Sequence, residues 1–251
     1  MTRRHRLSGL ALLALGFAMG AGCKEGEAPV VIVEETAAER GAALFRDPTV
    51  ASSPFNTYTC ATCHEASPGD TGAILSGVPL AGAVERPTYW AGNELDLLRA
   101  VNHCLYYFML DDEPWTAETE KARTIYAYLE SLPDGPSGAA AAPFTVVVTV
   151  ANPPQGDANR GNEVYADACA SCHGALHTGA ARLVERASIL PKEWLDEHPP
   201  DMYSDLDRRL LLVEKVRHGG FLGYGGQMPP YSRESLSDQA LGDLLALFGV
   251  P

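Results

Sequence analysis

Cys60-Ala61-Thr62-Cys63-His64 occurs in the first half of the chain, and Cys169-Ala170-Ser171-Cys172-His173 repeats it in the second half. Each copy reads Cys, two small residues, Cys and His. Thiols at this spacing lie about one helical turn apart. A zinc site, a redox-active cysteine pair or a disulfide can also use two such cysteines, but none of them requires a histidine directly afterwards. The repeated histidine therefore needs a chemical reason of its own.

Cys-x-x-Cys-His is the attachment signature of haem c. The two thiols add to the two vinyl groups of one haem, and the histidine that follows supplies a ligand to the iron. We therefore expect two covalently bound haems c. One would be held by Cys60, Cys63 and His64, and the other by Cys169, Cys172 and His173.

Similar helices are predicted around each motif. Gly41-Ala42-Ala43-Leu44-Phe45 precedes the first, and Gly161-Asn162-Glu163-Val164-Tyr165 precedes the second. Downstream of each motif, apolar residues recur at i, i+3, i+4 and i+7, which is typical of an amphipathic helix. These residues are Ile125, Tyr128, Leu129 and Leu132 in the first half, and Leu241, Leu244, Leu245 and Phe248 in the second. Ser237 is a suitable N-cap for the last helix.

This arrangement resembles class I cytochrome c over residues 37–133 and 157–251. The resemblance implies an all-α fold of two tandem domains, each built around one haem, with the first and last helices of each domain crossing. Residues 134–156 are then a linker. Its β-branched run at 144–150 predicts an extended strap that lies on one of the domains.

The N-terminus is predicted to be a signal peptide over residues 1–22. Arg3, Arg4 and Arg6 are followed by an uncharged run from 7 to 22, which is shorter than the ~20 apolar residues of a membrane helix. Gly20-Ala21-Gly22-Cys23 resembles a bacterial lipoprotein cleavage box, which implies lipidation of Cys23 and a tether over 23–36. The alternative is ordinary cleavage that leaves Cys23 as a free thiol. We expect a protein of the periplasm or cell envelope, attached to the membrane only by this lipid.

The composition narrows the classes of partner. The 251 residues are 46% hydrophobic and 20% charged, as in a globular protein, and the formal net charge is -13. Nucleic-acid binding needs a cationic surface, so that class is excluded. An acidic surface favours redox partner proteins with basic docking surfaces, since electrostatics steers such encounters.

The second haem needs a sixth ligand, and Met228 is the main candidate. It lies in Gly225-Gly226-Gln227-Met228-Pro229-Pro230-Tyr231, where glycines permit a close approach and prolines stiffen the chain. Met202 is a rival without that setting. His218 is an alternative ligand, although a surface or haem-edge position suits it better.

For the first haem, the candidates lie in a helix predicted over residues 93–110. Cys104 falls on the apolar face of this helix, together with Leu97, Val101 and Phe108. His103 falls on the opposite, solvated face. Met109 lies well away from Cys104 around the helix, so both cannot face the iron unless the helix ends between them. From the residues alone, Cys104 and Met109 remain alternatives.

A second resemblance involves Asn102-His103-Cys104, Met109 and Tyr126-Ala127-Tyr128-Leu129. These residues look like the N-terminal haem domain of dihaem thiosulfate dehydrogenases and related sulfur-oxidation cytochromes. That resemblance implies iron ligation by His64 and by the thiolate of Cys104. The family has arginines directly before the cysteine and a few residues after it. Here His103 and Leu105-Tyr106-Tyr107-Phe108 occupy those places.

The resulting expectation is a dihaem electron carrier, with electrons passing from the first haem to the second. A thiolate ligand lowers the potential of a haem and a thioether raises it, which sets this direction. The alternative is an oxidoreductase acting on a small sulfur anion such as thiosulfate at the first haem. We assign no catalytic residue. Tyr89 and Trp90 are candidates to pack on the first haem, and Arg86 and Arg182 to pair with propionates.

Overall fold

Helices are the regular secondary structure of this protein. The computed structural model describes residues 34–67, 69, 71–133, 143–149, 152–220 and 226–250. Within those ranges there is no strand, and the bridge between Tyr89 and Glu94 is isolated. The predicted all-α fold is therefore confirmed. The predicted signal peptide and Cys23 lie outside the described residues.

The helices begin and end where local chemistry favours it. Ser237 accepts a hydrogen bond from the backbone N–H of Ala240, as its predicted capping role requires. Thr36 and Ser204 head capping boxes. The α-helices are α1 (Ala37–Leu44), α2 (Cys60–Cys63), α3 (Leu97–Met109), α4 (Glu120–Ser131), α5 (Ala158–Ala168), α6 (Ala170–His173), α7 (Lys192–Glu197), α8 (Asp205–His218) and α9 (Asp238–Leu247). Short 3₁₀ turns are η1 (Pro48–Val50), η2 (Ala83–Glu85) and η3 (Trp90–Gly92).

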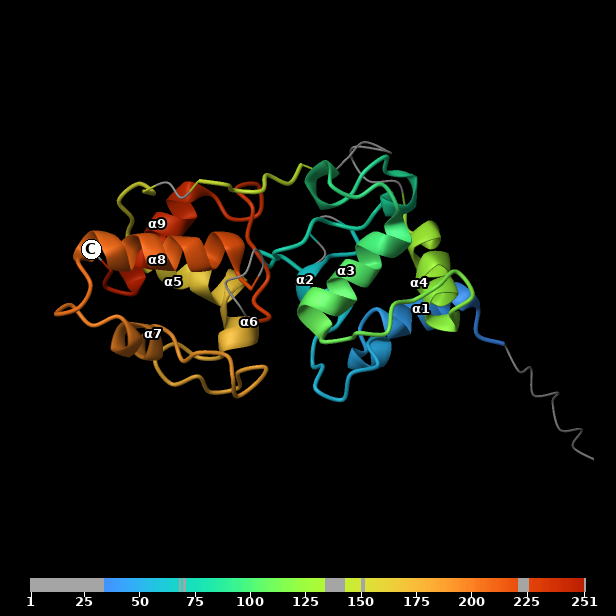
Figure 1. The fold of residues 1–251 in the computed structure, drawn as a ribbon, viewed down its shortest axis with the longest axis horizontal. Helices are drawn as coiled ribbons and strands as arrows, with labels where there is room; N and C mark the ends of the chain where they lie inside the picture. The colour runs from blue at the N-terminus through green and yellow to red at the C-terminus, as the bar shows by residue number, and fades with distance from the viewer. Residues whose placement is uncertain are drawn as a thin grey trace, which may run out of the picture. The chain divides into compact units, whose positions relative to one another are not determined.

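Two helix pairs repeat the same packing. Helix α1 packs on α4, and α5 packs on α9 (Figure 1). A Cβ atom on Gly41 would lie 2.2 Å from the carbonyl oxygen of Thr124, and one on Gly161 would lie 2.2 Å from that of Asp243. Each pair therefore crosses at a glycine, where the missing side chain lets the backbones approach.

The core falls into two clusters of buried residues. One gathers around Phe45 and Tyr128, whose ring centroids are 5.3 Å apart. The other gathers around Tyr165 and Phe248, with centroids 6.0 Å apart. The apolar residues predicted for the two late helices are buried in these clusters, except Leu132, which packs against its cluster while only partly buried. The chain from Glu35 onward forms one compact unit, and the division at 133 and 157 stays a prediction.

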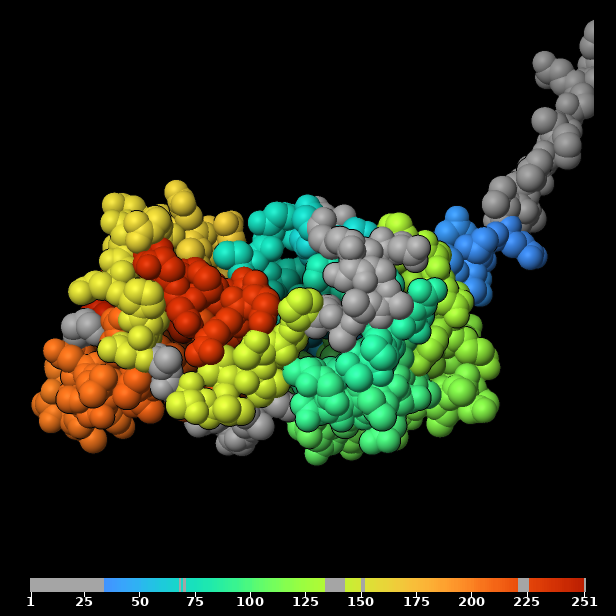
Figure 2. Space-filling model, turned by 90° about the horizontal axis from the view of Figure 1, so that it is seen from above, coloured from blue at the N-terminus to red at the C-terminus, as the bar shows by residue number. Residues whose placement is uncertain are grey.

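The described part of the linker, residues 143–149, is an extended strap. Thr145 donates from its backbone N–H and its hydroxyl to the carboxylate of Glu234. Figure 2 shows this yellow-green segment against the red C-terminal part of the chain. The carbonyl oxygen of Val147 is hydrogen-bonded to Nε2 of His218, whose Nδ1 lies 2.6 Å from a carboxylate oxygen of Glu214. His218 is 5% exposed, which contradicts a surface position, while the haem-edge position stays a prediction.

Candidate functional site

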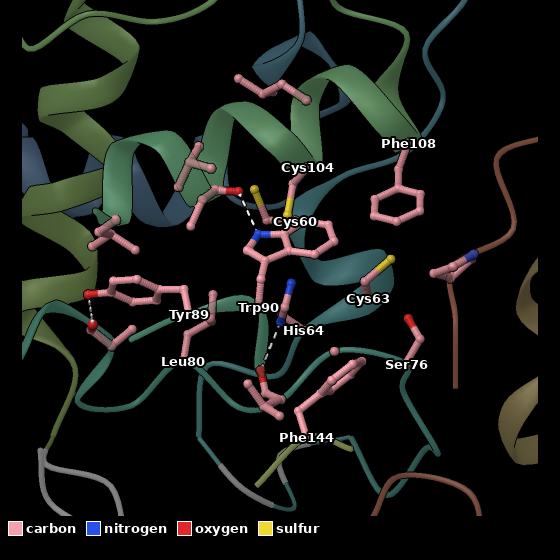
Figure 3. A pocket seen from close by; sticks show the side chains of 18 of the residues that line it. Cys60, Cys63, His64, Ser76, Leu80, Tyr89, Trp90, Cys104, Phe108 and Phe144 are labelled. Carbon is pink, nitrogen blue, oxygen red and sulfur yellow. Dashed lines mark hydrogen bonds between the residues drawn. The ribbon is translucent and has the colours of Figure 1, made fainter. Parts of the chain in front are cut away.

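A cavity of about 520 Å³ contains the first Cys-x-x-Cys-His motif. Cys60, Cys63 and His64 line it from α2 and the residue that follows. Cys104 projects into it from α3 (Figure 3). The rest of the lining is mainly apolar, and most of it comes from α3 and the segment 76–92, with further residues that include Ile125 and Leu129 of α4 and Phe144 of the strap. The volume lies within the range of cofactor sites in proteins.

The imidazole of His64 is fixed at one nitrogen. Its Nδ1 atom lies 2.8 Å from the carbonyl oxygen of Val78, which can only accept. Nδ1 therefore carries the hydrogen, and the lone pair of Nε2 remains for a metal. Burial lowers the pKa of His64, which favours the neutral, ligating form. A Cβ on Gly77 would lie 2.3 Å from the ring, so the backbone itself packs against the imidazole.

The thiols of the first motif occupy one short helix. The side chain of Thr59 caps α2 by accepting from the N–H of Thr62. Burial raises the pKa of Cys60 to about 12 and that of Cys63 to about 11. The five cysteines in the described part of the chain are all free. Both thiols of this motif are therefore available for covalent attachment.

Cys104 lies on the lining face of α3, as predicted. Leu97, Val101 and Phe108 line the same cavity. Burial raises the pKa of the Cys104 thiol, so without a metal it is neutral. Met109 is buried and also lines the cavity, which leaves the choice of ligand open.

Helix α3 is shorter than predicted at its start. It begins at Leu97 rather than at Asn93, because the carboxylate of Asp96 caps it by accepting from the N–H of Arg99 at 2.8 Å. Glu94 precedes this cap and is buried. One of its oxygens accepts from the N–H groups of Leu95 and Asp96. No local sequence pattern predicts that this carboxylate organises the turn.

The turn before α3 carries an aromatic residue into the site. Trp90 and Ala91 have positive φ values of 50° and 54°, an uncommon conformation outside glycine. The Trp90 indole N–H donates to the carbonyl oxygen of Ala100 at 3.2 Å, and its ring stacks on Phe108. Trp90 and Tyr89 line the cavity, in keeping with their expected place beside the first haem.

His103 is partly exposed, in agreement with the predicted solvated face, and it also contacts the turn before α3. Its Nε2 atom lies 3.3 Å from a carboxylate oxygen of Glu94, and its side chain is 41% exposed. Its ring meets the edge of Trp90 at 5.8 Å between centroids. It is not among the residues that line the cavity, and it contacts two residues of the turn before α3.

Arg86 places a cation at the wall of the cavity. One guanidinium nitrogen donates to the carbonyl oxygens of Pro79 and Ala81. The Nε atom is buried and has no hydrogen-bond partner among the described residues. Burial lowers the pKa of Arg86 from its ordinary value, but an arginine stays charged. Arg182, the other predicted propionate partner, donates to the carbonyl oxygen of Ala187 from one guanidinium nitrogen, and its pairing with a propionate stays a prediction.

The second motif repeats the histidine geometry of the first. Cys169 occupies the N-cap position of α6 without a side-chain capping hydrogen bond, and Cys172 and His173 lie within the helix. The Nδ1 atom of His173 lies 2.8 Å from the carbonyl oxygen of Ser188, which again leaves Nε2 for a metal. Burial lowers the pKa of His173. Cys169 and Cys172 are free thiols.

The two candidate methionines of the second half differ in environment. Met228 packs against the second core cluster, and its carbonyl oxygen accepts from the N–H of Gly220 at 2.6 Å. Met202 is 74% exposed. Met228 thus has the protected setting that a thioether ligand needs.

The donor sets fit haem c. Each motif has two free thiols and a neutral histidine whose Nε2 is left to bind iron. The first motif also lines a cavity whose walls are mainly apolar and include the cation of Arg86. Zinc would need about four ligands, and no group of three His, Cys, Asp or Glu side chains suited to a metal occurs in the described ranges. Among those ranges, no helix is long and apolar enough to cross a membrane.

Part of this chain matches the model of a known protein family. Residues 156–247 match the family model of cytochrome C oxidase, cbb3-type, subunit III. No curated protein matches the sequence. A solved structure of thiosulfate dehydrogenase from Marichromatium purpuratum is similar, with 21% identity and a TM-score of 0.41. That likeness covers 86% of this chain and 47% of the other, so this chain spans less than half its length. The family match shows that residues 156–247 resemble a domain of the cytochrome c type, and such domains hold covalently bound haem c.

Proposed function

We propose that the protein is a dihaem c-type cytochrome that transfers electrons in the cell envelope. The first haem would be attached to Cys60 and Cys63 and the second to Cys169 and Cys172. When bound, each haem supplies a one-electron couple between ferric and ferrous iron. His64 and His173 are the proximal ligands in this proposal.

One observation carries the proposal most strongly. His64 and Cys104 come from different elements and point into the same cavity, next to the attachment thiols (Figure 3). The hydrogen bond to Val78 orients His64, and α3 fixes the direction of Cys104. Metal binding deprotonates a thiol, so Cys104 would ligate as a thiolate although burial raises its pKa.

The proposed direction of electron flow follows from the ligands. A thiolate from Cys104 lowers the potential of the first haem, whereas a thioether from Met228 raises that of the second. Electrons would then pass from the first haem to the second. The net charge of -13 supports docking to partners with basic surfaces. Attachment to a membrane through a lipid on Cys23 completes the proposal.

Near-infrared magnetic circular dichroism of the oxidised, haem-loaded protein tests the ligands. We expect one thiolate-ligated and one methionine-ligated haem. Cys104→Ala should abolish the thiolate signal, and the matched variant Met109→Leu should leave it unchanged. Two methionine-ligated haems in the wild type would assign the first site to Met109 and overturn the role of Cys104.

A second function, oxidation of a small sulfur anion at the first haem, is favoured by Arg86. Its half-buried guanidinium lines the cavity that contains Cys104, and its Nε has no partner among the residues described. An oxyanion or a haem propionate would satisfy it. Thiosulfate turnover with an artificial electron acceptor tests this function. Turnover that Arg86→Gln abolishes supports an enzyme, and no turnover at saturating thiosulfate leaves the electron carrier.

A further inference from the structure

The side chain of Gln227 joins the loop that carries Met228 to the end of α3. Its Nε2 atom donates a hydrogen bond to the carbonyl oxygen of Phe108, 2.6 Å away. Gln227 is 9% exposed, so water has little access to this bond. Phe108 lies in the last turn of α3, where carbonyl oxygens have no partner within the helix. Gln227 therefore supplies a donor that the helix itself lacks.

Each end of this bond lies next to a proposed iron ligand. Cys104 precedes Phe108 by one helical turn on α3, and both residues line the first cavity. Gln227 directly precedes Met228 in the chain. A single hydrogen bond thus connects the segments that carry the two proposed sixth ligands.

The segment around Met228 is held firmly on its other side. The Met228 carbonyl oxygen accepts from the N–H of Gly220, and the N–H of Tyr231 donates to the carbonyl oxygen of Val216 on α8 at 3.0 Å. Pro229 and Pro230 follow Met228, have restricted φ angles and line the first cavity. Because the backbone around Met228 is rigid, a movement at the end of α3 would therefore be transmitted to Met228.

The environment of the Oε1 atom of Gln227 indicates that its Nε2 donor has a specific role. The Oε1 atom is buried and has no hydrogen-bond partner within the described part of the chain. A buried acceptor without a partner costs stability, and an apolar side chain would avoid that cost. Gln227 is thus a poor choice for stability alone. Its contribution lies in the one bond that it donates.

We propose that Gln227 is a positioning residue whose hydrogen bond makes the segment around Met228 and the end of α3 move together. The sixth-ligand positions of the two haem sites are thereby coupled. This inference rests on the proposed function, because it treats Cys104 and Met228 as iron ligands. The coupling is reciprocal, since linkage acts equally in both directions.

The test uses the full-length, haem-loaded protein with Gln227→Leu and a matched control, Gln239→Leu. Gln239 lies on α9 and donates its side-chain amide to Gln155 and Asp243, away from the first cavity. Gln227→Asn is the second variant, because it keeps an amide but shortens its reach. The readouts are the potential of the methionine-ligated haem, its sulfur-to-iron charge-transfer band and the amide hydrogen exchange of the last turn of α3.

For both Gln227 variants we expect about tenfold faster exchange in the last turn of α3 and a weaker charge-transfer band. The potential of the second haem should fall by about 59 mV, which is a tenfold change for one electron. Gln239→Leu should change none of these readouts. If Gln227→Leu does not fold, Gln227→Asn decides the question alone.

Two failures can be told apart. Wild-type exchange, band and potential in the Gln227 variants would overturn the coupling while leaving both haems and their ligands in place. A wild-type protein without a methionine-ligated second haem would overturn the proposed function, and the coupling with it. The wild-type spectrum therefore separates the two outcomes before any variant is compared.

Discussion

The Nδ1 atom of His64 lies 2.8 Å from the carbonyl oxygen of Val78. This contact fixes the tautomer and presents Nε2 to the cavity. His64→Ala should therefore remove one iron ligand while Cys60 and Cys63 still attach the haem. We expect an unchanged haem content by mass spectrometry and one altered haem in the optical spectrum.

The exposed His177 provides the control for that variant. His177→Ala should leave both haem spectra unchanged. An unaltered spectrum in His64→Ala would contradict the assignment of His64 as a ligand.

Burial of the cysteines predicts an order of alkylation in the haem-free protein. Burial raises the pKa of both Cys104 and Cys172, but Cys104 is the more deeply buried of the two. Because the thiolate is the nucleophile, Cys172 should react first with iodoacetamide at pH 8, and Cys104 should react only as the pH rises further. Peptide mass spectrometry at several pH values measures both rates. Equal rates at pH 8 would argue against a buried Cys104.

At the crossing of α1 and α4, we expect Gly41→Ala to destabilise the protein, which is the opposite of the usual effect of this substitution in a helix. Glycine to alanine within a helix usually stabilises it by about 1 kcal/mol. A Cβ on Gly41 would instead lie 2.2 Å from the carbonyl oxygen of Thr124, and such overpacking costs about 1–3 kcal/mol. Gly41→Ala should therefore lower the free energy of unfolding in urea. Ala43 is exposed in the same helix, so Ala43→Gly measures the effect of helix propensity alone. A stabilising Gly41→Ala would refute the close crossing.

Asp243 predicts a pH-dependent contribution to stability. Its carboxylate accepts from Arg160 at 2.8 and 2.9 Å and from the N–H of Asp157 at 2.7 Å, and these bonds lower its pKa from the ordinary 3.8. A lowered pKa in the folded state means that the stabilisation is present above about pH 3.8 and is lost as the pH falls below it. Asp243→Asn should cost about 2 kcal/mol at neutral pH.

Urea denaturation of the wild type and Asp243→Asn across a pH series measures this difference. The gap between the two should shrink as the pH falls from 4 toward 2. Asp196→Asn is the control, because its ion pair with Lys192 is exposed. A gap that is constant with pH would show that the carboxylate charge does not carry the effect.

The sequence predicted the parts of this site that depend on local pattern. Apolar periodicity placed Cys104 on the correct face of α3, and the side-chain oxygen of Ser237 identified the start of α9. These predictions rest on the geometry of single helices, which short stretches of sequence determine. The all-α fold was implied by the resemblance to class I cytochrome c, and the described residues confirm it.

The parts that escaped prediction depend on contacts between distant residues or on unusual backbone angles. Nothing local indicates that Gln227 bonds to Phe108, which lies 119 residues earlier. The positive φ of Trp90 is equally hidden, because tryptophan seldom adopts it. The sequence favours a surface or haem-edge position for His218, but its Nε2 atom is hydrogen-bonded to the carbonyl oxygen of Val147 in the strap, 71 residues earlier.

The register of the strap, residues 143–149, determines which of its side chains reaches the first cavity. Phe144 lines the first cavity, and Thr145, the very next residue, is held by Glu234. One residue of extended chain spans only about 3.3–3.6 Å and points its side chain opposite to its neighbour's. An insertion of one residue between them would turn the phenylalanine ring away from the cavity. The amino-acid sequence of this linker is thus constrained by its register, and the linker's length decides which side chain lines the first cavity.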